Sequence, residues 1–180
     1  MEKTQHKRQL LTEKMADHLL ANGFSGFTLR SLGAATGTSD RMLLHYFSDK
    51  EDLLAATLAL VAERLLASLR QLQTDKLDQP QLIGFLAALL QSPEVLPYTN
   101  LWLELTSVAI REGEPYRAVA AQISAAFLDW IKTSLKSDSA SSHAASSAFI
   151  LTFVEGLILL NAVGKADEAK RALGWALRGK

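Results

Sequence analysis

The chain of 180 residues contains no cysteine, which excludes a disulfide framework, a thiolate metal site and a thiol nucleophile. Proline and glycine are scarce, with 4 and 10 residues, and 48% of the residues are hydrophobic, so the chain is expected to be globular rather than disordered. Neither sign of charge is in excess, because 19 Lys and Arg balance 19 Asp and Glu. A polybasic, histone-like protein is therefore excluded.

Apolar runs long enough to span a membrane, about 20 residues, are also lacking. The nearest candidate, residues 148–163, includes Thr152, Glu155 and Asn161, and a carboxylate near the centre of a span is costly. We therefore expect a buried helix of a soluble protein there. The first nine residues are polar and no apolar signal segment follows them, which favours a cytoplasmic location.

What the sequence does contain is helical periodicity along almost its whole length. The stripe of Leu11, Met15 and Leu19 predicts a first helix at residues 4–22, and Gly23 ends it. Breakers separate further segments of the same kind, so we predict an all-α fold of about nine helices. The other expected ranges are 29–36, 40–47, 49–72, 80–91, 100–111, 116–135, 144–163 and 167–177, with residues 137–142 as a loop or helix start.

Three capping signals define helix starts in the first third of the chain. Thr28 and Ser39 are suitable N-caps for the second and third helices. Ser48 followed by Glu51 has the pattern of a capping box for the fourth helix. On the second helix, Leu32 and Ala35 are expected to face the core.

Three short helices, with a tight glycine-containing turn at residues 36–38 between the second and third, indicate a helix-turn-helix unit. On the third helix, Leu43 and Phe47 share one face and are predicted to be core residues. The opposite face fits a DNA major groove in size and composition. It carries Arg41, Met42, Leu44 and His45.

The residues from Gly23 to Leu54 resemble the DNA-binding domain of tetracycline-repressor-like (TetR) transcriptional regulators. The resemblance is carried by Gly23, Phe24, Thr28, Leu32, Ala35, Gly37, Ser39, Leu43, His45, Tyr46, Phe47, Lys50, Glu51, Leu53 and Leu54. The later part is similar more loosely, through residues 101–105, 115–117 and 154–157. The resemblance implies a helix-turn-helix DNA-binding domain at residues 1–48 and an effector-binding and dimerisation domain at residues 49–180.

A ligand-responsive regulator follows from this resemblance, most simply a repressor that binds a palindromic operator as a homodimer and is released by a small, largely apolar effector. Arg41 can contact guanine O6 and N7, while Met42 and Leu44 can pack on thymine methyl groups. The family usually carries a tyrosine at the position of Leu44, so a different operator is expected. The candidate DNA-binding residues are Thr28, Arg30, Ser39, Asp40, Arg41, Met42, Leu44, His45, Tyr46 and Lys50.

The resemblance also implies a ligand cavity among the middle helices. The candidate lining residues are Phe85, Trp102, Tyr116, Ile123, Phe127 and Phe153. Aromatic residues at these spacings can equally be core residues. Glu104 and Glu155 lie in apolar runs, and each can serve a structural role or face a cationic ligand.

The helix at residues 144–163 is apolar on all sides and must be covered on all sides. We therefore predict that it forms, with the last helix, a four-helix bundle across a two-fold axis. The alternative is that the last helix folds back and covers the second face within one chain. The predicted interface residues are Ala148, Leu151, Thr152, Glu155, Leu159, Ala162, Leu173 and Leu177.

An enzyme is disfavoured, because His6, His18, His45 and His143 are scattered and no HExxH, GxSxG or phosphate-binding glycine loop occurs. Neither a cofactor nor a metal ion is expected. A helical binding module without DNA affinity stays open as the second reading.

Overall fold

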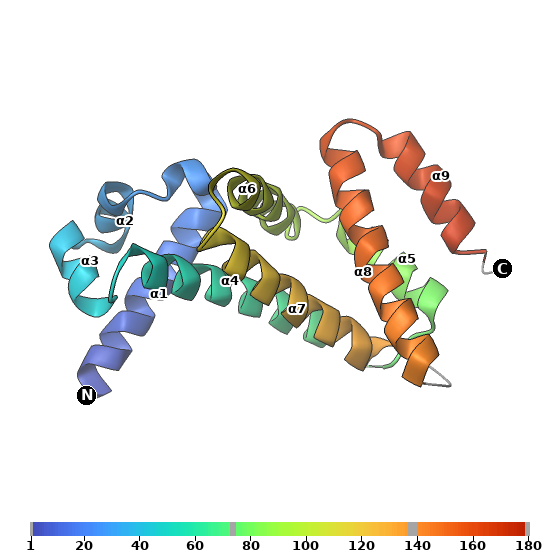
Figure 1. The fold of residues 1–180 in the computed structure, drawn as a ribbon, viewed down its shortest axis with the longest axis horizontal. Coiled ribbons are helices and arrows are strands. Elements are labelled where there is room, and N and C mark those ends of the chain that lie inside the picture. Colours follow the sequence, from blue (N-terminus) through green and yellow to red (C-terminus); the bar gives the residue numbers. More distant parts are fainter. Residues whose placement is uncertain (1, 73–74, 137–139, 179–180) are drawn as a thin grey trace. The chain divides into compact units, whose positions relative to one another are not determined.

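The computed structural model describes residues 2–72, 75–136 and 140–178, and it confirms the all-α class (Figure 1). Within these ranges one 3-10 turn, η1 (Phe24–Gly26), joins the first two helices, and Leu77 pairs with Leu135 in an isolated β-bridge. The described residues form nine α-helices: α1 (Glu2–Asn22), α2 (Leu29–Thr36), α3 (Asp40–Tyr46), α4 (Lys50–Leu72), α5 (Gln79–Leu89), α6 (Leu96–Glu112), α7 (Tyr116–Ser134), α8 (Ala140–Ala162) and α9 (Ala166–Ala176).

The chain packs as two compact units. The first unit contains α1 to α3, α4 as far as Leu65, and the segment Asn100–Ile123 from α6 and α7. The second unit contains the rest of α4, α5, the start of α6, the later part of α7, and α8 and α9. Each of the long helices α4, α6 and α7 thus contributes residues to both units.

Local sequence signals predict most helix ends. Three expectations are wrong: the cap of the fourth helix, the start of the sixth helix and the burial of Ala35. Asp49, not Ser48, caps α4, because its Oδ1 accepts a hydrogen bond from the backbone N–H of Asp52 (2.7 Å). The helix α6 begins at Leu96 and includes Pro97, which has no N–H to satisfy in a first turn. Ala35 is exposed, and Thr36 is buried in its place, with its hydroxyl donating to the carbonyl of Leu32 (2.7 Å).

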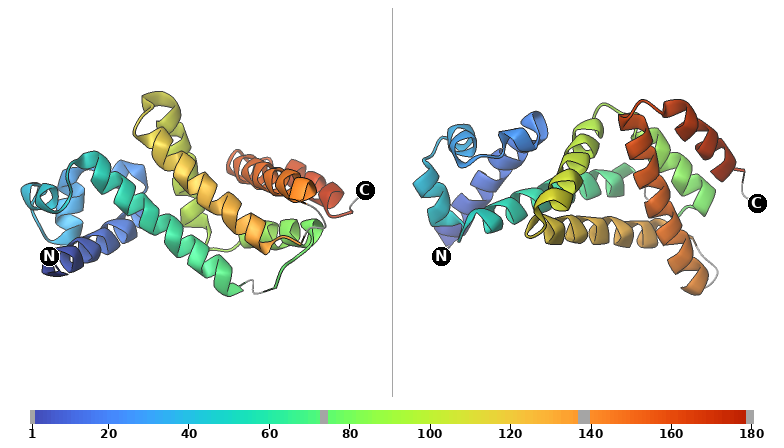
Figure 2. Two further views of the ribbon diagram at one scale, coloured as in Figure 1. Left: turned by 60° about the horizontal axis from the view of Figure 1, so that its bottom comes forward. Right: turned by 45° about the horizontal axis from the view of Figure 1, so that its top comes forward.

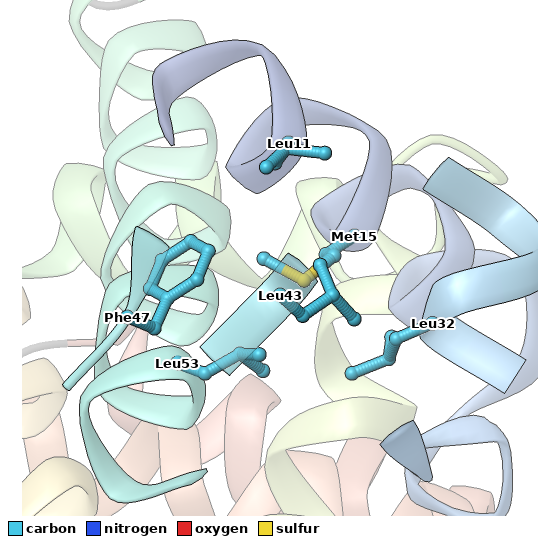
Figure 3. Packing of buried hydrophobic residues seen from close by; sticks show 6 residues of the cluster. All are labelled: Leu11, Met15, Leu32, Leu43, Phe47 and Leu53. Carbon is cyan, nitrogen blue, oxygen red and sulfur yellow. The ribbon is translucent and has the colours of Figure 1, made fainter. Parts of the chain in front are cut away.

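The core of the first unit lies where α1, α2, α3 and the start of α4 meet (Figure 3). Half-buried residues, among them Phe27, Leu29 and Tyr46, pack against its outside. Burial of this apolar surface is the main term that stabilises α2 and α3, which have eight and seven residues, because neither is long enough to be stable alone. The buried members are Leu11, Met15, Leu32, Leu43, Phe47 and Leu53.

In the second unit α5, α8 and α9 pack against one another (Figure 2). Ala87, Leu157 and Ala169 form the buried centre of this contact, one residue from each helix. Small alanine side chains on two of the three helices allow the backbones to approach closely. The last helix therefore covers one side of α8 within the chain.

The other side of α8 is not covered. Ile150, Val154 and Leu157 are buried, whereas Leu159 is 53% and Val163 60% exposed. Among the described residues, the segment Ser142–Ala162 is the one helical stretch long and apolar enough to cross a membrane by length and composition, and 22% of its most apolar window is buried. A single chain therefore leaves one side of this helix open, and its cover by a second copy stays a prediction.

Candidate nucleic-acid interface

Two N-caps and a glycine turn define the geometry of the helix-turn-helix unit. Thr28 Oγ1 accepts from the N–H of Ser31 (3.1 Å) and Ser31 Oγ accepts from the N–H of Thr28 (3.1 Å), which is a full capping box. Ser39 Oγ accepts from the N–H of Met42 (3.3 Å) at the start of α3. Both capping predictions are confirmed.

The turn between α2 and α3 depends on two glycines. Gly37 ends α2 with φ of 71° and ψ of 33°, the left-handed conformation that glycine adopts without strain. At Gly33 a Cβ would lie 2.9 Å from the carbonyl oxygen of Thr38, whose N–H donates to the carbonyl of Gly33 (2.9 Å). The closeness of this turn to α2 therefore requires glycine at position 33, a signal that the sequence reading missed.

The two faces of α3 are those predicted from the sequence. Leu43 and Phe47 are almost fully buried, at 0% and 1% exposure. The side chains of Arg41, Met42, Leu44 and His45 are exposed. The buried pair thus fixes the helix in the domain while the opposite face stays available to a partner.

The remaining candidate DNA-binding residues on α2 and α3 differ in how exposed their side chains are. Arg30 and Asp40 are exposed, but Asp40 Oδ1 would stand 3.1 Å from a Cβ at Gly33, so its carboxylate lies beside α2. Tyr46 is half-buried against the core, and its ring meets His45 edge-on at 5.2 Å. Arg30, Asp40 and His45 are therefore exposed, whereas Tyr46 packs against the core.

At the start of α4, Lys50 is exposed in the first helical position, next to backbone N–H groups that favour an anion. Asp52 fixes this end, because it accepts from the N–H of Ser48 (3.0 Å) and from Arg8 on α1 (2.6 Å). The guanidinium of Arg8 also lies 4.8 Å from the ring centroid of Phe47. Sequence reasoning missed Arg8, because its partners are distant in the chain.

The six candidate lining residues for a ligand are all half-buried, and they divide between the two units. In the first unit, Tyr116 lies against Phe24, with ring centroids 6.3 Å apart. In the second unit, Phe127 stacks on Trp130 at 5.8 Å, and Phe153 packs on the contact of α5, α8 and α9. Trp102 and Ile123 belong to the first unit and Phe85 to the second.

Glu104 is engaged within the protein, where its carboxylate accepts from the backbone N–H of Phe24. This contact favours a structural role for Glu104 over contact with a cationic ligand. Glu155 is half-buried on α8. Across the described parts of the chain, no group of three His, Cys, Asp or Glu side chains is placed to hold a metal ion.

The predicted interface residues on α8 and α9 lie mostly at the surface. Leu151, Glu155 and Leu173 are half-buried. On α9 the structure adds Trp175, which is 65% exposed and was not predicted. The exposed members of the predicted set are Ala148, Thr152, Leu159, Ala162 and Leu177.

Comparison with known proteins agrees with this geometry. Residues 15–57 match the family described as bacterial regulatory proteins, tetR family. The HTH-type transcriptional repressor AcnR of Corynebacterium efficiens and that of Corynebacterium glutamicum are each 27% identical over 117 residues, which is 65% of this chain. The chain spans 57% of the length of these relatives.

Solved structures with lower identity show the same fold. A crystal structure assigned to the TetR family, from Rhodococcus sp., is 21% identical, covers 97% of both chains and has a TM-score of 0.75. The multidrug binding protein EbrR, complexed with proflavin, is 17% identical over 94% of this chain and 99% of its own, with a TM-score of 0.69.

A helix-turn-helix with a fixed α3 and an exposed outer face defines a class of DNA-binding proteins. The family match covers residues 15–57, which include α2, α3 and the exposed outer face of α3.

Proposed function

We propose that the protein is a repressor that binds a palindromic operator as a homodimer and is released by a small, largely apolar effector. The observation that carries the proposal is the outer face of α3, where Arg41 and His45 are exposed while Leu43 and Phe47 anchor the helix. In this division of labour residues 1–48 bind DNA, and residues 49–180 bind the effector and dimerise. A repressor of this kind acts in the cytoplasm, where its operator is.

The uncovered side of α8 supports self-association. Leu159 of α8, Val163 just after that helix and Trp175 of α9 are each more than half exposed, so both helices present large apolar side chains to water. A membrane is the less favourable cover, because Glu155 lies near the middle of the helix. A second copy of α8 and α9 can cover this surface as a four-helix bundle. The two-fold axis of such a dimer calls for a palindromic operator.

An apolar effector is supported by the composition of the middle helices, where Phe85, Trp102 and Phe127 are half-buried rather than sealed in a core. EbrR, which has the same fold, was crystallised with proflavin. A ligand releases DNA only if it binds one arrangement of the protein more tightly than the other. The helices α4, α6 and α7, which contribute to both units, are the physical link for such a change.

A mobility-shift titration tests the DNA-binding part of the proposal. The full-length protein is titrated against the DNA upstream of its own gene and against a shuffled duplex of equal composition, at several salt concentrations. We expect the upstream DNA to bind more tightly, with a larger advantage at higher salt. Equal affinity at every salt concentration would contradict the proposal and leave a helical binding module without DNA specificity.

Tryptophan fluorescence tests the effector part. The three tryptophans differ in environment: Trp130 is buried, Trp175 is exposed, and Trp102 lies half-buried on α6. We expect a small, largely apolar compound that binds the middle helices to quench wild-type emission, to quench Trp102→Phe less, and to weaken operator binding. A set of compounds that quench but leave operator affinity unchanged would contradict the release mechanism.

A further inference from the structure

The helix α3 exposes two large apolar side chains, Met42 and Leu44, each 41% exposed. Neither belongs to the buried cluster that Leu43 and Phe47 join, nor to the half-buried residues packed around that cluster. A single exposed Met or Leu is ordinary. Two of them on a helix of seven residues, which this class of protein inserts into DNA, are not explained by the packing of the fold.

Their positions around the helix axis are specific. Successive residues of an α-helix are separated by about 100°. With Leu43 and Phe47 facing the core, Arg41 and His45 point directly away from it. Met42 and Leu44 then lie on opposite flanks of that polar centre. The exposed face of α3 is therefore a polar strip with one apolar side chain on each edge.

The major groove offers few matches to such a face. Guanine presents the acceptors O6 and N7, which suit the guanidinium of Arg41. The C5-methyl of thymine is the one methyl group in the groove, and most other base-edge groups are hydrogen-bond donors or acceptors. An apolar side chain that covers a donor or acceptor removes its water without replacing the hydrogen bond, which is costly.

We propose that α3 recognises a half-site in which the guanine bound by Arg41 is flanked by thymines, whose methyl groups are covered by Met42 on one side and Leu44 on the other. This rests on the proposed DNA-binding function and adds the chemistry of the preferred bases. Each covered methyl group contributes about a fourfold gain in affinity, from the transfer free energy of one buried methyl. Sequence preference in this protein thus depends on apolar contacts as well as on hydrogen bonds.

The test uses the full-length protein and the tightest-binding duplex that it selects from a randomised duplex library. Each thymine of that duplex is replaced in turn by deoxyuridine, which keeps the base pair and lacks the methyl group. We expect about a fourfold loss of affinity at the thymines that flank the selected guanine, and no change at thymines elsewhere.

Alanine variants assign each methyl group to a side chain. Met42→Ala is expected to abolish the thymine–deoxyuridine difference on one side of the guanine, and Leu44→Ala the difference on the other. Both side chains are exposed, so these variants are expected to fold. Ile110→Ala, at a residue 80% exposed on α6, is the matched control and keeps both differences.

The possible results separate this inference from the function on which it rests. If no duplex is enriched, the proposed DNA-binding function fails. If a duplex is enriched but binds equally well with deoxyuridine, DNA binding stands and the thymine inference is overturned. It is also overturned if both alanine variants keep the full preference for thymine.

Discussion

The carboxylate of Glu104 accepts a hydrogen bond from the backbone N–H of Phe24, with 2.5 Å between Oε2 and N. Glu104 lies on α6, whereas Phe24 begins η1, the link between α1 and α2. The ring of Phe24 also meets Tyr116, the first residue of α7, edge-on. Two residues of later helices, Glu104 in α6 and Tyr116 at the start of α7, therefore hold the link into the helix-turn-helix, and all of these residues belong to the first compact unit.

The closeness of Glu104 makes Gly23 hard to replace. Gly23 has φ of 66° and ψ of −169°, a region that is essentially restricted to glycine, and a Cβ there would lie 2.7 Å from both carboxylate oxygens of Glu104. We expect Gly23→Ala to lower the free energy of unfolding by about 2–3 kcal/mol, measured by urea denaturation. Gly113→Ala, with φ of 74° and no described atom within 4 Å of its Cβ, is expected to cost about 1 kcal/mol.

A double-mutant cycle isolates the contact between these residues. In a Glu104→Ala background the steric part of the Gly23→Ala cost disappears and the conformational part stays. We expect a coupling free energy above about 0.5 kcal/mol between the two substitutions. Equal costs of Gly23→Ala in both backgrounds would show that the carboxylate does not restrict position 23.

Arg41 and Lys50 are predicted to affect DNA binding differently. Arg41→Ala should cost about 1–3 kcal/mol on the preferred duplex and relax the preference at one base pair, because a base contact is lost. Lys50→Ala should weaken all duplexes alike and reduce the salt dependence by about one unit, because a phosphate contact is lost. Salt-dependent titrations of both variants against specific and shuffled DNA distinguish the roles. An identical pattern for the two variants contradicts the assignment.

The exposed face of α8 is predicted to be the dimer interface. Sedimentation equilibrium of the wild type at micromolar concentration should give twice the chain mass of 19.7 kDa. Leu159→Arg places a charge in the proposed interface and should shift the protein to monomer and weaken operator binding. Ile110→Arg, at a residue of α6 that is 80% exposed against 53% for Leu159, should stay dimeric. A Leu159→Arg variant that is folded, dimeric and fully active on DNA excludes this interface.

Tyr116 is predicted to make stability fall at alkaline pH. Burial, and then the negative charges of Glu112 and Glu51, raise the pKa of Tyr116 above its ordinary value of 10.0. The folded protein thus favours the neutral phenol, so this contribution is complete below pH 10.0 and is lost as the pH rises through the folded pKa. Tyr116→Phe keeps the ring and should lose less stability than the wild type between neutral and strongly alkaline pH. Parallel urea titrations of the two proteins provide the check.

Local sequence signals determined the elements of the helix-turn-helix. The caps at Thr28 and Ser39 and the end of α1 at Gly23 depend on residues at most four positions apart, so they can be recognised without tertiary information. The burial of Leu43 and Phe47 follows from helical periodicity alone. For the same reason, the exposed face of α3 was predicted residue by residue.

Tertiary structure decided the features that join distant segments. Asp52, in the first turn of α4, is held by Arg8 on α1. The carboxylate of Glu104 accepts a hydrogen bond from the backbone N–H of Phe24, eighty positions earlier in the chain. One side of α8 is buried by α5 and α9, and the other side is exposed. Because the helix is apolar on all sides, its own sequence does not indicate which side is buried. In each case several partners were chemically acceptable, and only the packing of the whole chain selects one.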